Sequence, residues 1–427
     1  MKYKVSKKDR FIQGEVSFSS SKSICNRLLI INALTGNKSV IHNLSESDDT
    51  KVLYQALINE PINIDIGHAG TSMRFLTAYL AAKPYEKDCS SCNAWACKSD
   101  ECPVKIITGS DRMQNRPIGV LVNALRQLGA KIEYAAKEGF PPLRIEGTKL
   151  KGGYLEIDGS VSSQYITAIL LIAPTLEEGI TLKLTGKIIS QSYIKLTLDL
   201  MRFFGIEYHW ENDTITIKPQ IYQPKELTAE ADWSSASYWY EMIALSEGGK
   251  VHLSGLLPNS LQGDAKLVDF FAPLGVKTVF DDMGCILSHN ESKIKFFEAD
   301  FINNPDIAQT LAVTLVLKKI PFKFTGLDTL RIKETDRIKA LQVELAKMGA
   351  NLVETTVGTL EWDGKFSCGE EGEIIIKTYD DHRMAMAFAP AAMMLKELTI
   401  EDPMVVTKSY PEYWDDLQKV GFSYKET

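Results

Sequence analysis

The sequence predicts an α/β protein of two lobes, built from six copies of one repeat. A pattern of helix, glycine and strand recurs through the 427 residues. Its glycines, Gly129, Gly205, Gly275, Gly349 and Gly421, lie 76, 70, 74 and 72 positions apart. A unit of about 70 residues buries too little apolar surface to be stable alone, so the copies are expected to assemble into two lobes of three.

Each copy is expected to contain an amphipathic helix that ends at its glycine, as at 121–129, followed by a short alternating strand, as at 130–134. Glycine is favoured there because the residue that ends a helix often adopts a left-handed conformation. A worn copy without the glycine, 52–57 followed by 62–66, precedes the other five. Helix-glycine-strand patterns are common in α/β proteins, but a near-constant period over five copies favours a repeat.

The composition is that of a soluble globular protein, with 44% hydrophobic and 24% charged residues. The net charge of −7 does not favour nucleic acid or an anionic membrane, so any bound anion needs a local basic cluster. Residues 1–16 have no apolar core and do not resemble a signal peptide. The apolar stretches at 166–174 and 384–395 are shorter than the roughly 18 residues of a membrane span, and we expect them to be buried helices of a cytoplasmic protein.

Small polar residues precede several apolar segments in the first half of the chain. Serines with Lys22 and Arg27 precede 28–34, an arrangement that suits either an anion site at a helix start or an exposed capped helix. Gly70 and Arg74 open another apolar segment, and this signal is weak alone. Neutral hydrogen-bonding residues at 159–165 precede a third and would suit polar substrate atoms.

Arg112 and Arg116 stand just before Pro117, which is favoured in the first turn of a helix. A helix start and the Arg116 guanidinium would then jointly hold a carboxylate or phosphate. A surface loop with solvated arginines is the alternative.

The second half of the chain has a charge run at 331–337, in which cationic neighbours would tune Glu334, although most charge runs are solvated faces. Residues 380–383 precede a long apolar segment. Basic residues therefore gather near predicted helix starts: Lys22, Arg27, Arg74, Arg112, Arg116, Lys333, Arg337, Arg383 and Lys408. This pattern predicts a focused site for a small, anion-rich ligand. The sequence contains neither a His-Glu-x-x-His metal motif nor a dinucleotide-binding fingerprint.

Taken in order, these motifs resemble the enolpyruvyl transferase family, and most closely its 5-enolpyruvylshikimate-3-phosphate (EPSP) synthases. The matching segments are Ser-Lys-Ser-x-x-Asn-Arg at 21–27, Ala-Gly-Thr-x-Met-Arg at 69–74, Arg-Met-x-x-Arg-Pro-Ile at 112–118, Ser-Ser-Gln at 162–164, Ser190 with Tyr193, Asp232 with Ser-Ser-Ala-Ser at 234–237, Asn-Ser-x-Gln-Gly-Asp at 259–264, Pro305 with Asp306, Lys-Glu-Thr-Asp-Arg at 333–337, Asp-His-Arg-Met-Ala-Met at 381–386, and Lys408. Each segment is a weak signal, and the ordered set is specific.

The resemblance implies a fold of two lobes, each of three βαβαββ repeats arranged as an inside-out α/β barrel. One lobe would be discontinuous, formed by 1–19 and 230–427, and the other would be 20–229. Ligands would bind in the cleft between the lobes, which would close on them.

The resemblance also implies the reaction. The enolpyruvyl group of phosphoenolpyruvate would move to the 5-hydroxyl of shikimate 3-phosphate by addition and elimination, with release of phosphate. This is a step of chorismate and aromatic amino acid biosynthesis. No cofactor is implied, neither nucleic acid nor membrane is an expected partner, and a monomer is expected.

Site residues follow from the resemblance position by position. Those implied for phosphoenolpyruvate are Lys22, Gly70, Arg116, Gln164, Arg337, Arg383 and Lys408. Those implied for shikimate 3-phosphate are Lys22, Ser23, Arg27, Ser162, Ser163, Gln164, Ser190, Tyr193, Asp306 and Lys333. Proton transfer would fall to Lys22, Asp306 and Glu334.

Three residues depart from the family pattern. His68 stands where an Asn usually precedes Ala-Gly-Thr, Phe75 where a Pro usually follows the Arg, and Thr329 where an Asn usually lies. The first two flank the phosphoenolpyruvate residues, so the sequence does not predict herbicide sensitivity. His68 is expected to be a hydrogen-bonding substitute rather than a catalytic group.

An insertion at 85–103 contains Cys89, Cys92, Cys97 and Cys102. The total of seven cysteines is odd, and the other three are isolated, so a disulfide framework is not expected. The four clustered cysteines suit either a zinc site or a loop with reduced thiols that is dispensable for catalysis, and their spacing lacks the usual two pairs.

Two alternative functions remain at this point. The sister enzyme acting on UDP-N-acetylglucosamine shares the fold and carries a catalytic Cys, occasionally Asp, where this chain has Asp111. The serines at 162–163, Ser190 with Tyr193, and the 333–337 motif favour the shikimate enzyme. A non-catalytic anion-binding protein is the other alternative, and the combination of Lys22, Asp306, Glu334 and Arg383 argues against it.

Overall fold

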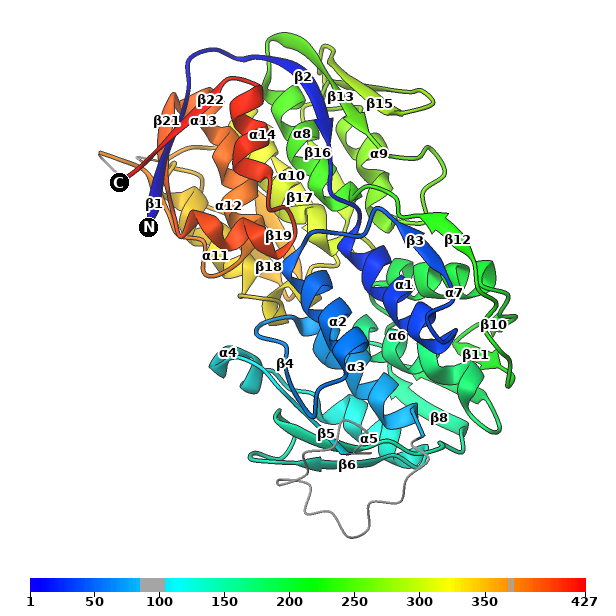
Figure 1. Ribbon diagram of the computed structural model, residues 1–427. Helices are drawn as coiled ribbons and strands as arrows, with labels where there is room; N and C mark the ends of the chain where they lie inside the picture. Colours follow the sequence, from blue (N-terminus) through cyan, green and yellow to red (C-terminus); the bar gives the residue numbers. More distant parts are fainter. Residues whose placement is uncertain (85–103, 368, 370–371) are drawn as a thin grey trace. The chain divides into compact units, whose positions relative to one another are not determined.

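The computed structural model describes residues 1–84, 104–367, 369 and 372–427. The chain divides into two compact units (Figure 1). Unit 1 comprises Met1–Ser21 and Glu230–Thr427, and unit 2 comprises Lys22–Ala229. The first crossing therefore lies two residues after the expected boundary at 19/20, and the second lies at 229/230.

Two copies in unit 2 show the βαβαββ order in full. Two parallel strands, joined by a helix, occupy one side of a four-stranded sheet, and a second helix leads to an antiparallel hairpin that fills the other side. One copy consists of β4 (Asn63–Asp65), α3 (Gly70–Ala82), β5 (Val104–Thr108), α4 (Asp111–Gln114), α5 (Gly119–Gln127), β6 (Lys131–Tyr134) and β7 (Leu143–Glu146). The other consists of β8 (Gly153–Asp158), α6 (Ser163–Ile172), β9 (Ile180–Thr185), α7 (Gln191–Phe203), β10 (His209–Glu211) and β11 (Thr214–Ile217).

Unit 1 has three copies with the same strand order. The first has β2 (Phe11–Ser17), α8 (Trp233–Leu245), β13 (Gly248–Ser254), α9 (Leu267–Phe271), β14 (Val276–Phe280) and β15 (Gly284–His289). The second has β16 (Phe297–Asp300), α10 (Ala308–Leu317), β17 (Phe322–Thr325), α11 (Arg337–Ala346), β18 (Val353–Thr356) and β19 (Thr359–Trp362). The third has β20 (Ile375–Ile376), α12 (His382–Phe388), α13 (Ala392–Leu395), β21 (Glu397–Glu401), α14 (Tyr413–Lys419), β22 (Phe422–Glu426) and the N-terminal β1 (Lys2–Lys7), which pairs with β21 and β22.

The remaining copy of unit 2 is shorter than the others, and the strand that the sequence predicted for it belongs to the next copy. It comprises α1 (Lys22–Leu34), β3 (Val40–His42), α2 (Asp48–Asn59) and β12 (Glu226–Thr228), and its sheet has two parallel strands within the described part of the chain. The strand predicted at 62–66 does not belong to it. That strand is β4, which pairs in parallel with β5 and opens the next copy, because the chain leaves α2 without forming a hairpin.

The period of the glycines reflects backbone conformation, as predicted. Gly129, Gly205, Gly275, Gly349 and Gly421 have φ between 85° and 102°, a region that other residues enter only with strain. In the short copy Glu60 takes this place at φ 40°, and its N–H donates to the Ala56 carbonyl. The short copy thus keeps the left-handed residue at the end of its helix, although this residue is not a glycine.

The first helix of each copy is buried. In unit 2 these are α1, α3 and α6, which pack on one another, and in unit 1 they are α8, α10 and α12, where α10 contacts both neighbours. The apolar stretches at 166–174 and 384–395 lie in α6 and in α12 with α13, as expected for buried helices. Among the described residues, none of the helices has the length and apolar character that a membrane span requires.

Candidate active site

The polar motifs lie where parallel strands end and helices begin. In open α/β sheets such strand ends are the usual place for ligands. Motifs at α1, α3, α6, α8, α10 and α12 open the first helix of each copy, and Arg116, Ser190, Lys333 and Lys408 precede second helices. Side chains cap several of these starts: the Ser162 hydroxyl accepts from Gln164 N at 3.3 Å, and the Asp381 carboxylate accepts from Arg383 N at 2.9 Å.

Arg337 organises the site of unit 1. Its side chain is 1% exposed, and its guanidinium donates to Asp381 at 2.7 Å, Asp306 at 2.8 Å and Glu334 at 2.8 Å. These carboxylates come from three parts of the chain: the start of α12, the turn η3 (Pro305–Ile307), and the loop before α11. Two of the predicted proton-transfer groups, Asp306 and Glu334, are therefore held by one buried cation.

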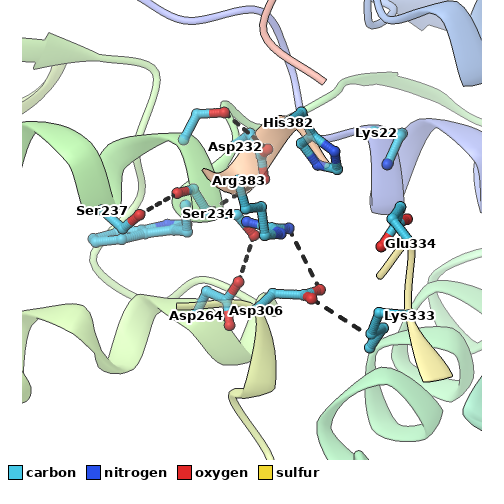
Figure 2. Close-up of polar contacts among 12 residues, drawn as sticks. Lys22, Asp232, Ser234, Ser237, Asp264, Asp306, Lys333, Glu334, His382 and Arg383 are labelled. Carbon is cyan, nitrogen blue, oxygen red and sulfur yellow. Dashed lines mark hydrogen bonds and ion pairs between the residues drawn. The ribbon is translucent and has the colours of Figure 1, made fainter. Parts of the chain in front are cut away.

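Asp306 also faces two further cations (Figure 2). Its Oδ2 lies 3.4 Å from Arg383 Nη2, and its Oδ1 lies 3.6 Å from Lys333 Nζ. Lys408 donates to the Asp380 carbonyl at 2.6 Å, and Asp380 has a left-handed backbone at φ 55° just before α12. Strained residues of this kind are often found at functional sites. Unit 1 thus brings together Asp306, Lys333, Glu334, Arg337 and Arg383, with Lys408 joined through the backbone.

Arg27 is the corresponding buried cation of unit 2. Its Nε donates to Thr197 Oγ1 at 2.8 Å and its Nη1 to the Ser23 carbonyl at 2.6 Å. The rings of Phe75 and Tyr193 lie 5.7 and 5.8 Å from its guanidinium carbon. Burial lowers the pKa of Arg27 to about 10, which leaves it charged at neutral pH. Phe75, one of the departures from the family pattern, therefore packs beside Arg27.

Lys22 and Ser190 lie at two other helix starts of unit 2. Lys22 is the first residue of α1, and its ammonium lies 3.6 Å from the Asp49 carboxylate. Ser190 precedes α7 with φ 53°, a left-handed conformation for a residue with a side chain. Ser163 and Gln164 open α6, and the Gln164 amide donates to Thr71 Oγ1 at 3.4 Å beside Gly70.

Arg116 packs directly on Gly70. A Cβ added at Gly70 would lie 2.6 Å from Arg116 Nη1, so a side chain here would displace the guanidinium from this position. Arg116 is half-buried and pairs with no carboxylate among the described residues. It therefore presents a charge that an anionic ligand can take up.

The expected helix start beside Arg116 is wrong. Helix α5 begins at Gly119 and its N-cap is Ile118, so Pro117 lies before the cap rather than in the first turn. The N–H groups of Ile118 and Gly119 donate to the Gly139 carbonyl at 2.9 and 3.2 Å. These two donors are therefore already occupied within the protein, and Pro117 does not open a helix beside Arg116.

Two of the residues that depart from the family pattern, and the cluster of four cysteines, remain to be placed. His68 is exposed, and Thr329 is buried with no partner for its hydroxyl in the described chain. Cys89, Cys92, Cys97 and Cys102 lie outside the described residues. Within the described residues, no cluster of three or more His, Cys, Asp or Glu side chains could hold a metal ion.

Sequence reasoning missed several carboxylates of the site. Asp49 contacts Lys22, Asp381 contacts Arg337, and Asp264 is buried beside Ser234, whose hydroxyl donates to it. Asp264 and Asp381 were both inside motifs of the family resemblance, so the signal was present. The motifs did not indicate the partners of these carboxylates, because Ser234 lies 30 positions from Asp264 and Arg337 lies 44 positions from Asp381.

Repeats whose helix starts present arginines beside carboxylates agree with the resemblance to the enolpyruvyl transferases. Comparisons with known proteins make this specific. The family model for EPSP synthase (3-phosphoshikimate 1-carboxyvinyltransferase) matches residues 6–59 and 53–417. The chain therefore belongs to the EPSP synthase family.

Individual relatives agree. The chain is 48% identical over 415 residues to a 3-phosphoshikimate 1-carboxyvinyltransferase of Bacteroides fragilis, covering 97% of each chain. It is 36% identical to the enzyme of that name from Sulfurovum, over 96% of this chain and 97% of the relative. The solved EPSP synthase of Acinetobacter baumannii has the same fold, with a TM-score of 0.77 at 20% identity over the whole of both chains. The predicted family, fold and enzyme class are thus confirmed.

Proposed function

We propose that the enzyme transfers the enolpyruvyl group of phosphoenolpyruvate to the 5-hydroxyl of shikimate 3-phosphate by addition and elimination, with acid and base groups of its own. The observation that carries this proposal is the Arg337 cluster, which holds Asp306 and Glu334 on one buried guanidinium. A protein that only binds anions has no need of two carboxylates beside its cations. Their presence supports proton transfer.

Phosphoenolpyruvate carries a carboxylate and a phosphate, and both favour two-pronged contacts with arginine. Arg116, Arg337 and Arg383 are the proposed arginine ligands, with Lys22, Lys408, Gly70 and Gln164 completing the set. Arg116 supports this assignment because its guanidinium packs on Gly70 without a carboxylate partner in the described chain.

Shikimate 3-phosphate is the proposed ligand of the Arg27 region. Arg27 is charged, buried and flanked by two rings, so an anion placed beside it would offset part of its desolvation. Hydroxyl groups supply the further contacts in this proposal, together with one amide, two lysines and the base: Ser23, Ser162, Ser163, Ser190, Tyr193, Gln164, Lys22, Lys333 and Asp306.

The reaction needs two proton-handling groups. Glu334 gives a proton to the methylene carbon of phosphoenolpyruvate, and the neighbouring carbon gains cationic character. The shikimate hydroxyl attacks that carbon while Asp306, assisted by Lys22, takes up the hydroxyl proton. Phosphate then leaves with the hydroxyl proton that Asp306 had taken up, and Glu334 retrieves a proton from the methyl group to restore the double bond. Asp306 and Glu334 share the Arg337 guanidinium, so their roles in proton transfer are coupled.

The test of the proposal is release of phosphate from phosphoenolpyruvate by the purified protein. Release that depends on shikimate 3-phosphate, and that UDP-N-acetylglucosamine does not support, is the expected result. Equal or greater release with the UDP-sugar would assign the sister reaction. No release with either acceptor, in folded protein that still binds shikimate 3-phosphate, would reject catalysis.

The proposal includes a monomer that acts in the cytoplasm. The described sheets of each unit are all completed by strands of the same chain, so assembly of the fold requires no second copy. Light scattering of the purified protein at several concentrations would measure its mass, and a concentration-independent dimer would contradict the monomer.

A further inference from the structure

Asp264 is a buried carboxyl group to which the predicted site gives no role. It lies in the turn η2 (Gly263–Lys266) and is 5% exposed. The Ser234 hydroxyl, in the first turn of α8, donates to its Oδ2 (Figure 2). Burial of an acidic group is costly, so its retention at this position calls for a reason.

The segment that carries Asp264 connects two helix starts. Gln262 accepts from Trp233 N at 3.2 Å and donates to the Ala231 carbonyl at 2.8 Å, which fixes the segment on the start of α8. The Asn304 amide donates to the Gly263 carbonyl at 2.6 Å, and Asn304 is two residues before Asp306. The turn that holds Asp306 therefore rests on the turn that holds Asp264.

Asp306 faces an electrostatic conflict. Arg337, Lys333 and Arg383 lie 2.8, 3.6 and 3.4 Å from its oxygens, and cations at these distances favour the ionised carboxylate. A general base works best when its proton affinity suits the operating pH. Without an opposing charge, Asp306 would take up the hydroxyl proton poorly.

We propose that Asp264 is a positioning residue for Asp306: its buried negative charge offsets the surrounding cations and keeps Asp306 able to take up a proton. This inference rests on the proposed role of Asp306 as a base. Asp264 acts through Asp306 and does not touch the reacting atoms.

The charges around Asp264 agree with this role. Its pKa is raised to about 6, chiefly by burial and next by Asp306, with a smaller increase from Asp232 at the start of α8, while Arg383 and the Ser234 hydroxyl lower it. The interaction is mutual, so ionised Asp264 increases the proton affinity of Asp306. Near neutral pH Asp264 is mostly ionised and supplies this charge, and below about pH 6 it is mostly protonated.

Two substitutions separate this account from a structural role, because they are expected to move the pH profile of kcat in opposite directions. Asp264→Asn removes the charge and keeps the shape, so the acid limb should move to lower pH by about half a unit or more, and the plateau should fall about 10-fold. Ser234→Ala keeps the carboxyl group but removes a hydrogen bond that lowers the pKa of Asp264, so Asp264 should lose its charge at higher pH and the acid limb should move to higher pH.

Asp269→Asn is the control, since Asp269 is an exposed acid on α9 that pairs with Lys266, and it should leave the profile unchanged. An acid limb that stays in place in both folded variants, whatever the loss of kcat, would overturn the role of Asp264. Asp306→Asn tests the underlying proposal separately. If that variant keeps near-normal turnover, Asp306 is not the base; if it loses turnover while the acid limb of Asp264→Asn does not move, the failure is that of Asp264 alone.

Discussion

Arg337 of unit 1 and Arg27 of unit 2 are both buried, at 1% and 4% exposure, yet they are stabilised in opposite ways. Burial alone would lower the pKa of Arg337, but Asp381, Glu334 and Asp306 together raise it. Arg27 contacts hydroxyls, backbone carbonyls and two rings, and no carboxylate among the described residues pairs with it. Its pKa is lowered by burial.

The difference indicates that the buried arginines of the two units have different roles. The charge of Arg337 is already balanced by carboxylates, two of which, Asp306 and Glu334, are the proposed proton-transfer groups. The charge of Arg27 is balanced only in part, so an anionic substrate would complete it. We infer that Arg27 acts chiefly by binding an anion, whereas Arg337 also organises the carboxylates around it.

Removing the organising cation should have the largest effect. Arg337→Met would leave Asp306, Glu334 and Asp381 facing one another, and breaking a buried ion cluster from one side costs about 3–5 kcal/mol of the free energy of unfolding. Denaturant unfolding would measure this. Arg331→Met is the control, because Arg331 is an exposed arginine of the same region and its loss should matter little. A stability of Arg337→Met equal to that of the control would contradict the comparison.

Removing Arg27 should lower the affinity for shikimate 3-phosphate more than it lowers the stability of the protein. Arg27→Met loses the charge–anion contact but leaves no carboxylate uncompensated, so stability should change by less than about 1 kcal/mol while affinity for shikimate 3-phosphate falls about 100-fold. Calorimetric titration with shikimate 3-phosphate measures the affinity. Arg202→Met, at an exposed position on α7, is the matched control. Loss of several kcal/mol of stability without loss of affinity would reverse the assignment.

Asp264 is a buried carboxyl group, and burial makes its ionised form less stable than it is in water. Its pKa is raised from 3.8 to about 6, so the folded protein binds this proton more tightly than the unfolded chain does. The stabilisation from that proton is complete below the unfolded pKa and is lost as pH rises through about 6. Asp264→Asn should therefore gain roughly 1–3 kcal/mol near neutral pH and nothing near pH 4. Unfolding at both pH values tests this, and a loss of stability at neutral pH would contradict it.

Substitution of Gly70 tests whether Arg116 must lie where it does, and it should have the smallest effect of these variants. The methyl group of Gly70→Ala would displace the guanidinium, so the KM for phosphoenolpyruvate should rise about 10-fold while affinity for shikimate 3-phosphate stays the same. Gly248→Ala is the control, because an added Cβ there meets its nearest atom at an ordinary 3.7 Å. An unchanged KM for phosphoenolpyruvate would exclude Arg116 as its ligand.

The sequence was sufficient for features that depend on neighbouring residues. The glycine period predicted the helix ends, since a left-handed residue is a local requirement. Charged residues at 331–337 and 380–383 were placed correctly at the starts of α11 and α12. The order of the motifs identified the family.

Features that depend on distant partners were not predicted. Gly139 occupies the N–H groups at the start of α5, which a local preference for proline could not indicate. The pairing of β4 with β5 decides to which copy 62–66 belongs, and Asp381 reaches Arg337 from 44 positions away. Such contacts are set by tertiary packing rather than by periodicity.

The central claim is that Glu334 gives a proton to the methylene carbon and later retrieves one. The most direct measurement is the rate at which deuterium from deuterated water enters the methylene group of the product, compared between the wild type and Glu334→Gln. A positioned proton donor contributes about 10²–10⁴-fold, so the account predicts label in the wild type and a rate lower by that factor in the variant, with binding of shikimate 3-phosphate retained. Unlabelled product from the wild type, or a near-normal rate in the variant, would contradict it.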